Sequence, residues 1–256
     1  QKGWKWYMKT FFPNANNGQK IGTMTPQYMS GYKSNSSEQI ADRIKKQLPQ
    51  VKIIALLRHP IERSFSQHKM HKRYGFVTSS FDRSVNSLLK KNLNKERQRI
   101  DHSNMFLFAS EYGRILSYYY NIFPKKNILI LYTNDLENDP RKALKDVFDF
   151  LDVSTDYTPK DINRHSHVGS GGARVAFLTP GFLKKHPALN FLWKGVVPIK
   201  LRKRLFMRIT RWNIKNDSSK LDSKGDAYKK LLSHFEKDVR LLEKVSEIKI
   251  PWNEWN

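Results

Sequence analysis

The sequence predicts an α/β domain in which helices cover a parallel sheet, and two observations support this prediction. Two short apolar runs, 51–57 and 126–132, hardly alternate with polar residues, as is typical of strands that are buried on both faces. Longer segments with apolar residues at helical spacing lie between and after these runs. Strands and helices in this order form parallel sheets. We expect residues 1–256 to form a single domain, because one hydrophobic core is still adequate at this length.

The elements before the first apolar run are short. Residues 1–12 are rich in aromatic side chains and are expected to form a packed helix or an irregular segment. A short strand is expected at 20–25, after a cluster of turn residues. Ser36 or Ser37 can cap a helix at about 38–47.

The elements after the first apolar run are mostly helical. The spacing of apolar residues predicts helices at about 60–73, 81–91, 105–123 and 140–151. Residues 158–174 resemble a loop, and a last helix with one apolar face begins at Gly225.

Composition restricts the classes of partner and of chemistry. The chain has 47 Lys and Arg against 23 Asp and Glu, a net charge of +24, which attracts nucleic acid, an anionic membrane surface, an acidic polymer or a phosphorylated small molecule. The absence of cysteine excludes disulfides, thiolate metal sites and a cysteine nucleophile. No apolar run reaches eighteen residues, so no membrane-spanning helix is expected. The basic segment 194–215 could line an acceptor groove, rest peripherally on an acidic membrane or form a solvated face.

The junction between the first buried run and the next helix predicts a phosphate site. Arg58 ends the run and Pro60 begins the helix, and ligands bind at the carboxyl ends of parallel strands, where a helix N-terminus stabilises an anion. Arg58 adds a planar set of donors, and Ser66 could add a hydroxyl if the chain bends back. The alternative is that Arg58 pairs with Glu62 or Asp135 and that Ser66 is an ordinary residue of the helix surface.

The same stretch resembles a motif of a known family. Residues 51–66, with Arg58, Pro60, Arg63 and Ser66, resemble the 3′-phosphate-binding motif of sulfotransferases that use 3′-phosphoadenosine-5′-phosphosulfate (PAPS). Further segments resemble the family in the same order along nearly the whole chain, most closely its bacterial and Golgi-type carbohydrate branch: 21–29, 111–140, 148–151, 163–174 and 242–255.

The resemblance implies a P-loop-like three-layer fold and transfer of a sulfuryl group from PAPS to a hydroxyl or amine, with a carbohydrate as the acceptor and no metal. At the matching positions, Arg58 and Ser66 hold the 3′-phosphate, and Arg174, beside the glycines of 169–172, adds a third contact. The family's first strand, its loop for the 5′-phosphosulfate and the helix after it have no counterpart, and truncation is preferred over loss. A truncated chain should bind the nucleotide weakly and transfer little. A cytoplasmic location is favoured, with the Golgi lumen as the alternative if a membrane anchor has been removed.

The catalytic base is not assigned. In the carbohydrate branch the base is commonly the Glu of a Gly-Glu-x-(Ser/Thr)-Pro segment, but the corresponding residue here is Thr23, whose neutral hydroxyl cannot accept a proton near pH 7. Substitute candidates are His68 and His71 on the helix after the motif. Their alternative role is that of solvent-facing helix residues.

Three other functions remain as alternatives. A basic nucleic-acid-binding module would explain the charge and the aromatic content, but not the arrangement of strand, Arg58 and Ser66, so nucleic acid is the less favoured partner. A P-loop kinase would share the architecture, but the chain lacks G-x-x-x-x-G-K-[ST] and a pair of Asp residues for Mg²⁺. The third alternative is an inactive protein of sulfotransferase-like fold.

Overall fold

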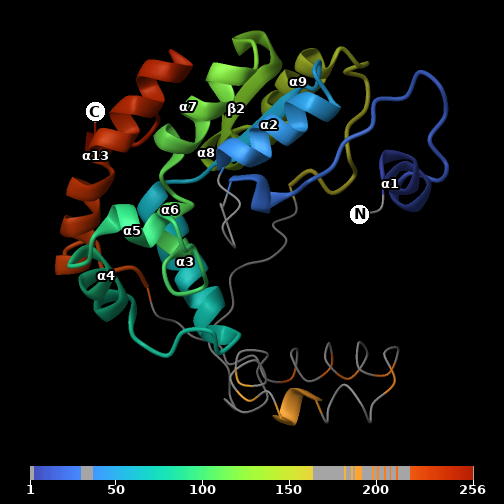
Figure 1. Cartoon of the computed structure of the whole chain (residues 1–256). Coiled ribbons are helices and arrows are strands. Elements are labelled where there is room, and N and C mark those ends of the chain that lie inside the picture. Colours follow the sequence, from blue (N-terminus) through green and yellow to red (C-terminus); the bar gives the residue numbers. More distant parts are fainter. Residues whose placement is uncertain are drawn as a thin grey trace.

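The computed structural model describes residues 3–29, 37–163 and 220–255, with a few scattered residues between 182 and 212. This part of the chain is a mixed α/β structure with parallel strands, as predicted (Figure 1). Its strands are β1 (Ile53–Leu57) and β2 (Ile128–Tyr132). Its helices are α1 (Trp4–Phe11), α2 (Ser37–Gln47), α3 (Pro60–Arg73), α4 (Phe81–Leu89), α5 (Leu93–Arg97), α6 (Met105–Phe108), α7 (Tyr112–Ile122), α8 (Thr133–Asn138), α9 (Pro140–Leu151) and α13 (Asp226–Ser246). Short 3₁₀ turns span Pro26–Met29, Lys125–Asn127 and Asn253–Trp255.

The sheet consists of β1 and β2 within the described residues. They pair in parallel, with Ile53 opposite Ile128 and Leu57 opposite Tyr132. A parallel pair needs a long crossover connection, and here α3 to α7 provide it.

The two strands differ in burial. All of β2 is buried or partly buried, as expected, whereas β1 alternates. Ala55 and Leu57 are buried, but Ile54 and Leu56 remain 40% and 51% exposed. The prediction that both faces of β1 are buried is therefore wrong within the described residues, because none of their elements covers the face that carries Ile54 and Leu56.

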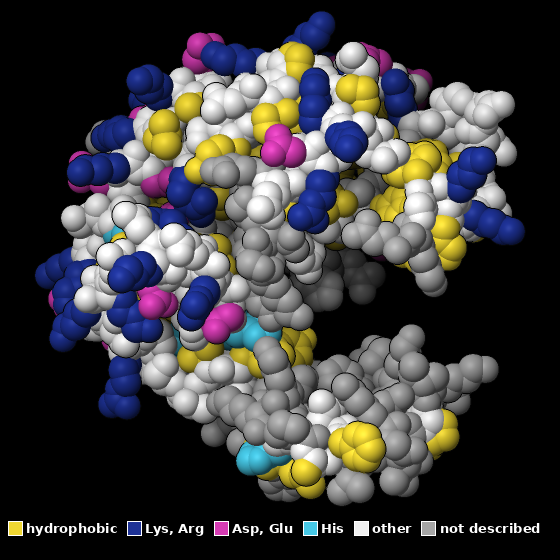
Figure 2. Space-filling view, viewed as in Figure 1, with side chains coloured by type: hydrophobic (Ala, Val, Ile, Leu, Met, Phe, Trp, Pro, Cys, Tyr) yellow, Lys and Arg dark blue, Asp and Glu magenta, His cyan; other side chains and the backbone are white. Residues whose placement is uncertain are grey.

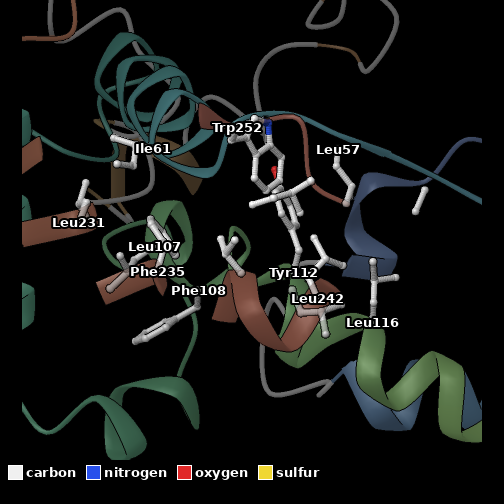
Figure 3. Close-up of a cluster of buried hydrophobic side chains, with 14 of the residues drawn as sticks. Leu57, Ile61, Leu107, Phe108, Tyr112, Leu116, Leu231, Phe235, Leu242 and Trp252 are labelled. Carbon is white, nitrogen blue, oxygen red and sulfur yellow. The ribbon is translucent and has the colours of Figure 1, made fainter. Parts of the chain in front are cut away.

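Helix α13 runs along α7 and also contacts α3 and α4, while α2 packs on α7 (Figure 1). The core lies between these helices and the sheet (Figure 3). Close contact between α7 and α13 depends on Gly113, since a Cβ there would lie 2.0 Å from the carbonyl oxygen of Asp238. The Asp238 carboxylate accepts hydrogen bonds from the backbone N–H groups of Gly113 and Arg114, at 2.9 and 2.7 Å, and so caps α7.

The predicted helix 105–123 is interrupted, because residues 109–111 separate α6 from α7. The interruption turns Glu111 inward, where its 3% exposed carboxylate accepts hydrogen bonds from Arg97 at 2.7 and 2.9 Å and from Arg114 at 2.7 Å. His234 of α13 lies 3.2 Å away. Burial raises the pKa of Glu111, but the contact with His234, the hydrogen bonds from Arg97 and the nearby arginine charges outweigh it and lower the pKa to about 2. The ionised carboxylate therefore links α5, α7 and α13.

The N-terminal expectations are only partly confirmed. Residues 4–11 are helical, but no residue of α1 is buried, and the helix stands apart from the other labelled helices in Figure 1. The strand expected at 20–25 is wrong, because this segment is irregular and its side chains are mostly exposed. The next turn is held by the Tyr119 hydroxyl, which donates to the Tyr28 carbonyl oxygen at 2.9 Å.

Candidate anion-binding site

Buried side chains hold the turn from β1 to α3 on the side that faces the core. Leu57, the last residue of β1, and Ile61, in the first turn of α3, are both fully buried. The buried Tyr112 of α7 donates its hydroxyl hydrogen to the carbonyl oxygen of Arg58 at 2.9 Å. Arg58 and His59, the two residues of the turn, therefore have a defined backbone position.

The Arg58 side chain lies at the surface and pairs with Glu62. Its Nε and Nη2 atoms lie 3.0 and 2.9 Å from the same carboxylate oxygen, Oε2, and the two side chains are 47% and 49% exposed. The pairing with Glu62, considered above as an alternative, is thus present. Asp135, the other acidic candidate, instead accepts a hydrogen bond from the backbone N–H of Tyr132 at 2.8 Å.

Ser66 is exposed on α3, four residues after Glu62. Residues four apart share a helix face, so Ser66 lies on the same face of α3 as Glu62, the partner of Arg58. The described hydrogen bonds include none between Arg58 and Ser66. The two predicted phosphate ligands are therefore both exposed, but they are not joined by a hydrogen bond.

His59 occupies the N-cap position of α3 but makes no capping hydrogen bond through its side chain. Its ring is buried and stacks on Trp255, with the ring centroids 5.1 Å apart, and meets Trp252 edge-on at 5.8 Å. Its Nε2 lies 3.4 Å from Glu254, whose carboxylate also accepts a 2.8 Å hydrogen bond from the Tyr228 hydroxyl. Burial lowers the pKa of His59, and Glu254 opposes this shift.

Sequence reasoning missed this packing of the C-terminal residues 252–255 against the junction. The aromatic pattern Trp-Asn-Glu-Trp was the signal available in the sequence. The segment is far from Arg58 along the chain, so only the tertiary structure shows that it supports the turn.

Arg63, part of the motif, points toward the interior. Its Nη1 donates to the Ser110 hydroxyl at 3.0 Å, and Ser64, buried beside it, also bonds Ser110 at 3.0 Å. Burial lowers the pKa of Arg63. Within the described residues, Arg63 therefore connects α3 to the turn before α7 and does not face the exposed side with Ser66.

His68 and His71, the substitute candidates for a base, are buried, each with 2% exposure. His68 Nε2 lies 2.9 Å from the Ser84 hydroxyl, and burial is the main cause that lowers the pKa of His68 to about 4. His71 Nδ1 lies 2.7 Å from the carbonyl oxygen of His102. The alternative role of solvent-facing helix residues is wrong for both. Thr23 is exposed, 3.4 Å from the Thr25 hydroxyl.

Other predicted features lie beyond what the structure describes. Arg174, the predicted third ligand, and the glycine cluster at 169–172 fall outside the described residues, as does most of the basic segment 194–215. In the described part of the chain, no group of three His, Asp or Glu side chains is arranged to hold a metal ion. No described helix combines the length and hydropathy needed to cross a bilayer.

The charge of the chain is widely distributed. Figure 2 shows Lys and Arg side chains spread over the visible face of the strands and the helices around them, with fewer Asp and Glu side chains between them. The basic residues do not gather into one patch on this face, so its charge alone marks no binding site there.

Comparison with known proteins gives the chain its family. No curated protein matches the sequence. A search of solved structures finds the crystal structure of a sulfotransferase from Alicyclobacillus acidocaldarius, with a TM-score of 0.62 and 18% identity over 97% of this chain and 73% of that one. This likeness confirms the P-loop-like fold expected from the sequence. A model of the sulfotransferase family matches residues 2–157, which include β1, the Arg58 junction and β2. The chain therefore belongs to the sulfotransferase family.

Proposed function

We propose that this protein transfers a sulfuryl group from PAPS to a hydroxyl or amine of a carbohydrate. Membership of the sulfotransferase family supports sulfuryl transfer. The observation that supports a nucleotide donor is the exposed guanidinium of Arg58, presented where a parallel strand passes into the N-terminus of a helix.

The residues present fit a phosphate group. Arg58 is half-exposed, so a ligand can reach it, and the first turn of α3 adds the partial positive charge of a helix N-terminus. Ser66 offers an exposed hydroxyl on the face of α3 that also carries Glu62, the partner of Arg58. We assign the 3′-phosphate to Arg58 and Ser66, with Arg174 as a third contact.

The donor, when bound, supplies an activated sulfuryl group. The residues of the chain bind and orient the nucleotide and offset its negative charge, which are the main contributions to this kind of in-line transfer. None of Thr23, His68 and His71 is assigned as the base that accepts the proton of the acceptor group. The Thr23 hydroxyl is neutral, and the two histidines are buried. No metal ion takes part.

Nucleotide titration tests the phosphate assignment. 3′-Phosphoadenosine-5′-phosphate (PAP), the product of the donor, should bind more tightly than AMP, which lacks the 3′-phosphate. Arg58→Ala should weaken PAP binding by about 1.5 to 3 kcal/mol, the size of a hydrogen bond to a charged group, and leave AMP unchanged. Arg240→Ala is the matched control, because Arg240 is also exposed and paired with a glutamate, on α13. Equal binding of PAP and AMP by the unaltered protein would refute the assignment.

A separate assay tests the acceptor. Labelled PAPS is incubated with the protein and with either glycans or simple phenols, and the labelled product is counted. We expect label on the glycans. Label on phenols alone would contradict the carbohydrate assignment while leaving the donor site intact.

A further inference from the structure

The ion pair between Arg58 and Glu62 uses only part of the guanidinium. Nε and Nη2 both contact the single oxygen Oε2 of Glu62, at 3.0 and 2.9 Å. A guanidinium carries five N–H donors in a rigid plane. Nε–H donates a hydrogen bond to this oxygen and Nη2 lies beside the same oxygen, so Glu62 takes up the side edge of the group, which Nε and Nη2 form. The two hydrogens of Nη1 and the second hydrogen of Nη2 remain, and two of these form the parallel pair of donors along the end edge.

The end edge is available in the structure. No described residue accepts a hydrogen bond from Nη1 of Arg58, and the side chain is 47% exposed, so solvent reaches it. Two parallel N–H donors match two oxygens of a phosphate, and this bidentate arrangement is the strong form of the contact. Glu62 therefore leaves unoccupied an edge of Arg58 that can bind a phosphate in this bidentate way.

Glu62 also restricts a side chain that would otherwise be mobile. An exposed arginine samples many rotamers and loses this freedom when it binds a ligand. Glu62 belongs to the first turn of α3, so its backbone is held by the helix. Tyr112 fixes the carbonyl oxygen of Arg58. The backbone and the head of Arg58 are thus held by two different residues.

We propose that Glu62 is a positioning residue that orients Arg58 for bidentate binding of a phosphate, rather than an anion that competes with the phosphate for Arg58. This inference rests on the proposed function, since it concerns the same 3′-phosphate. It extends that function by assigning a role to an acidic residue beside an anion site, where like charges repel. The orientation gained on the side edge outweighs this repulsion, because Glu62 and the phosphate occupy different edges of the guanidinium.

Two substitutions at Glu62 separate orientation from competition. Glu62→Ala removes both the acceptor oxygen and the charge, and should weaken PAP binding roughly tenfold, which is the size of coupling expected for residues in one network. Glu62→Gln keeps an oxygen that can accept from Nε and Nη2, and should keep PAP affinity within about threefold of the unaltered protein. AMP binding should not change in either variant. Tighter PAP binding by both variants would show competition and overturn the proposal, and unchanged PAP binding by Glu62→Ala would also overturn it.

Matched controls make the result specific. Asp146→Ala removes the acidic partner of another exposed pair at the same spacing, with Lys142 on α9, and should not alter PAP binding. The pair of Arg58 and Glu62 is half-exposed, so its loss should cost little stability, and thermal unfolding checks that each variant is folded. In an Arg58→Ala background, Glu62→Ala should cause no further loss. If Arg58→Ala weakens PAP binding and Glu62→Ala does not, only the positioning role fails. If neither variant weakens PAP binding, the assignment of the 3′-phosphate to Arg58 fails as well.

Discussion

At the scale of single residues, the histidines of the β1–α3 region belong to the interior of the protein. His59 lies against Trp252 and Trp255, and His68 packs edge-on against Phe81 and Phe106 at centroid distances of 5.5 and 5.6 Å. An imidazole in such surroundings favours its neutral form, because burial disfavours charge. Of the predicted site residues in this region, Arg58 and Ser66 are instead exposed.

The burial of His68 predicts a pH dependence of stability. Its pKa is about 4 in the folded protein and about 6.5 when unfolded, so the unfolded chain binds an extra proton between these values. The contribution of His68 is therefore present above about pH 6.5 and is lost as the pH falls toward 4. Between pH 7 and 4, the free energy of unfolding should fall by about 3 kcal/mol more in the unaltered protein than in His68→Gln. Urea titrations at several pH values measure this, and parallel curves for the two proteins would contradict it.

At the scale of elements, the packing of α7 against α13 determines where Tyr112 and Glu111 lie. Gly113 lets the two backbones approach, and Asp238 caps α7 in the same place. Tyr112 then reaches back to the carbonyl oxygen of Arg58. The helix pair thus holds the backbone of the β1–α3 junction, where the proposed site lies, although neither helix contributes an exposed ligand to it.

Gly113→Ala should be destabilising despite the better helix propensity of alanine. The added Cβ would lie 2.0 Å from the Asp238 oxygen and 2.8 Å from the Leu242 nitrogen, both backbone atoms, so α7 and α13 must separate. Overpacking of this kind costs about 1 to 3 kcal/mol, against a gain of about 1 kcal/mol from propensity. Chemical denaturation measures the net loss. Gly22→Ala is the control, since nothing lies within 4 Å of the Cβ position there, and equal stability of the two variants would show that the helices can adapt.

At the scale of the whole molecule, the net charge of +24 acts on every anion and is distinct from the proposed site. Screening by salt weakens interactions between exposed charges over about 8 Å at physiological ionic strength, whereas direct hydrogen-bonded contacts are less affected. The charge therefore promotes unspecific attraction, and discrimination between anions depends on local geometry.

Salt should separate these two kinds of binding. Raising the salt concentration from about 0.05 to 0.5 M should remove most binding of a random oligonucleotide, because that binding depends on release of counterions. The ratio of PAP to AMP affinity should persist, because it reflects contacts at the 3′-phosphate. Fluorescence titrations with both kinds of ligand test this. A PAP preference that disappears with salt, together with tight oligonucleotide binding that remains, would favour the nucleic-acid alternative.

The sequence alone determined the elements whose signals are local. The two apolar runs identified β1 and β2, Pro60 and the apolar spacing identified α3, and the apolar face after Gly225 identified α13. The resemblance of residues 51–66 indicated the family that the comparisons then showed. These features depend on neighbours along the chain, which a sequence displays directly.

Only the tertiary structure decided what depends on distant contacts. It separated α6 from α7, because Glu111 pairs with Arg97 and contacts His234, and it left one face of β1 exposed. It also placed the two candidate histidines in the interior. Burial is set by elements that meet in space, so spacing along the chain does not specify it.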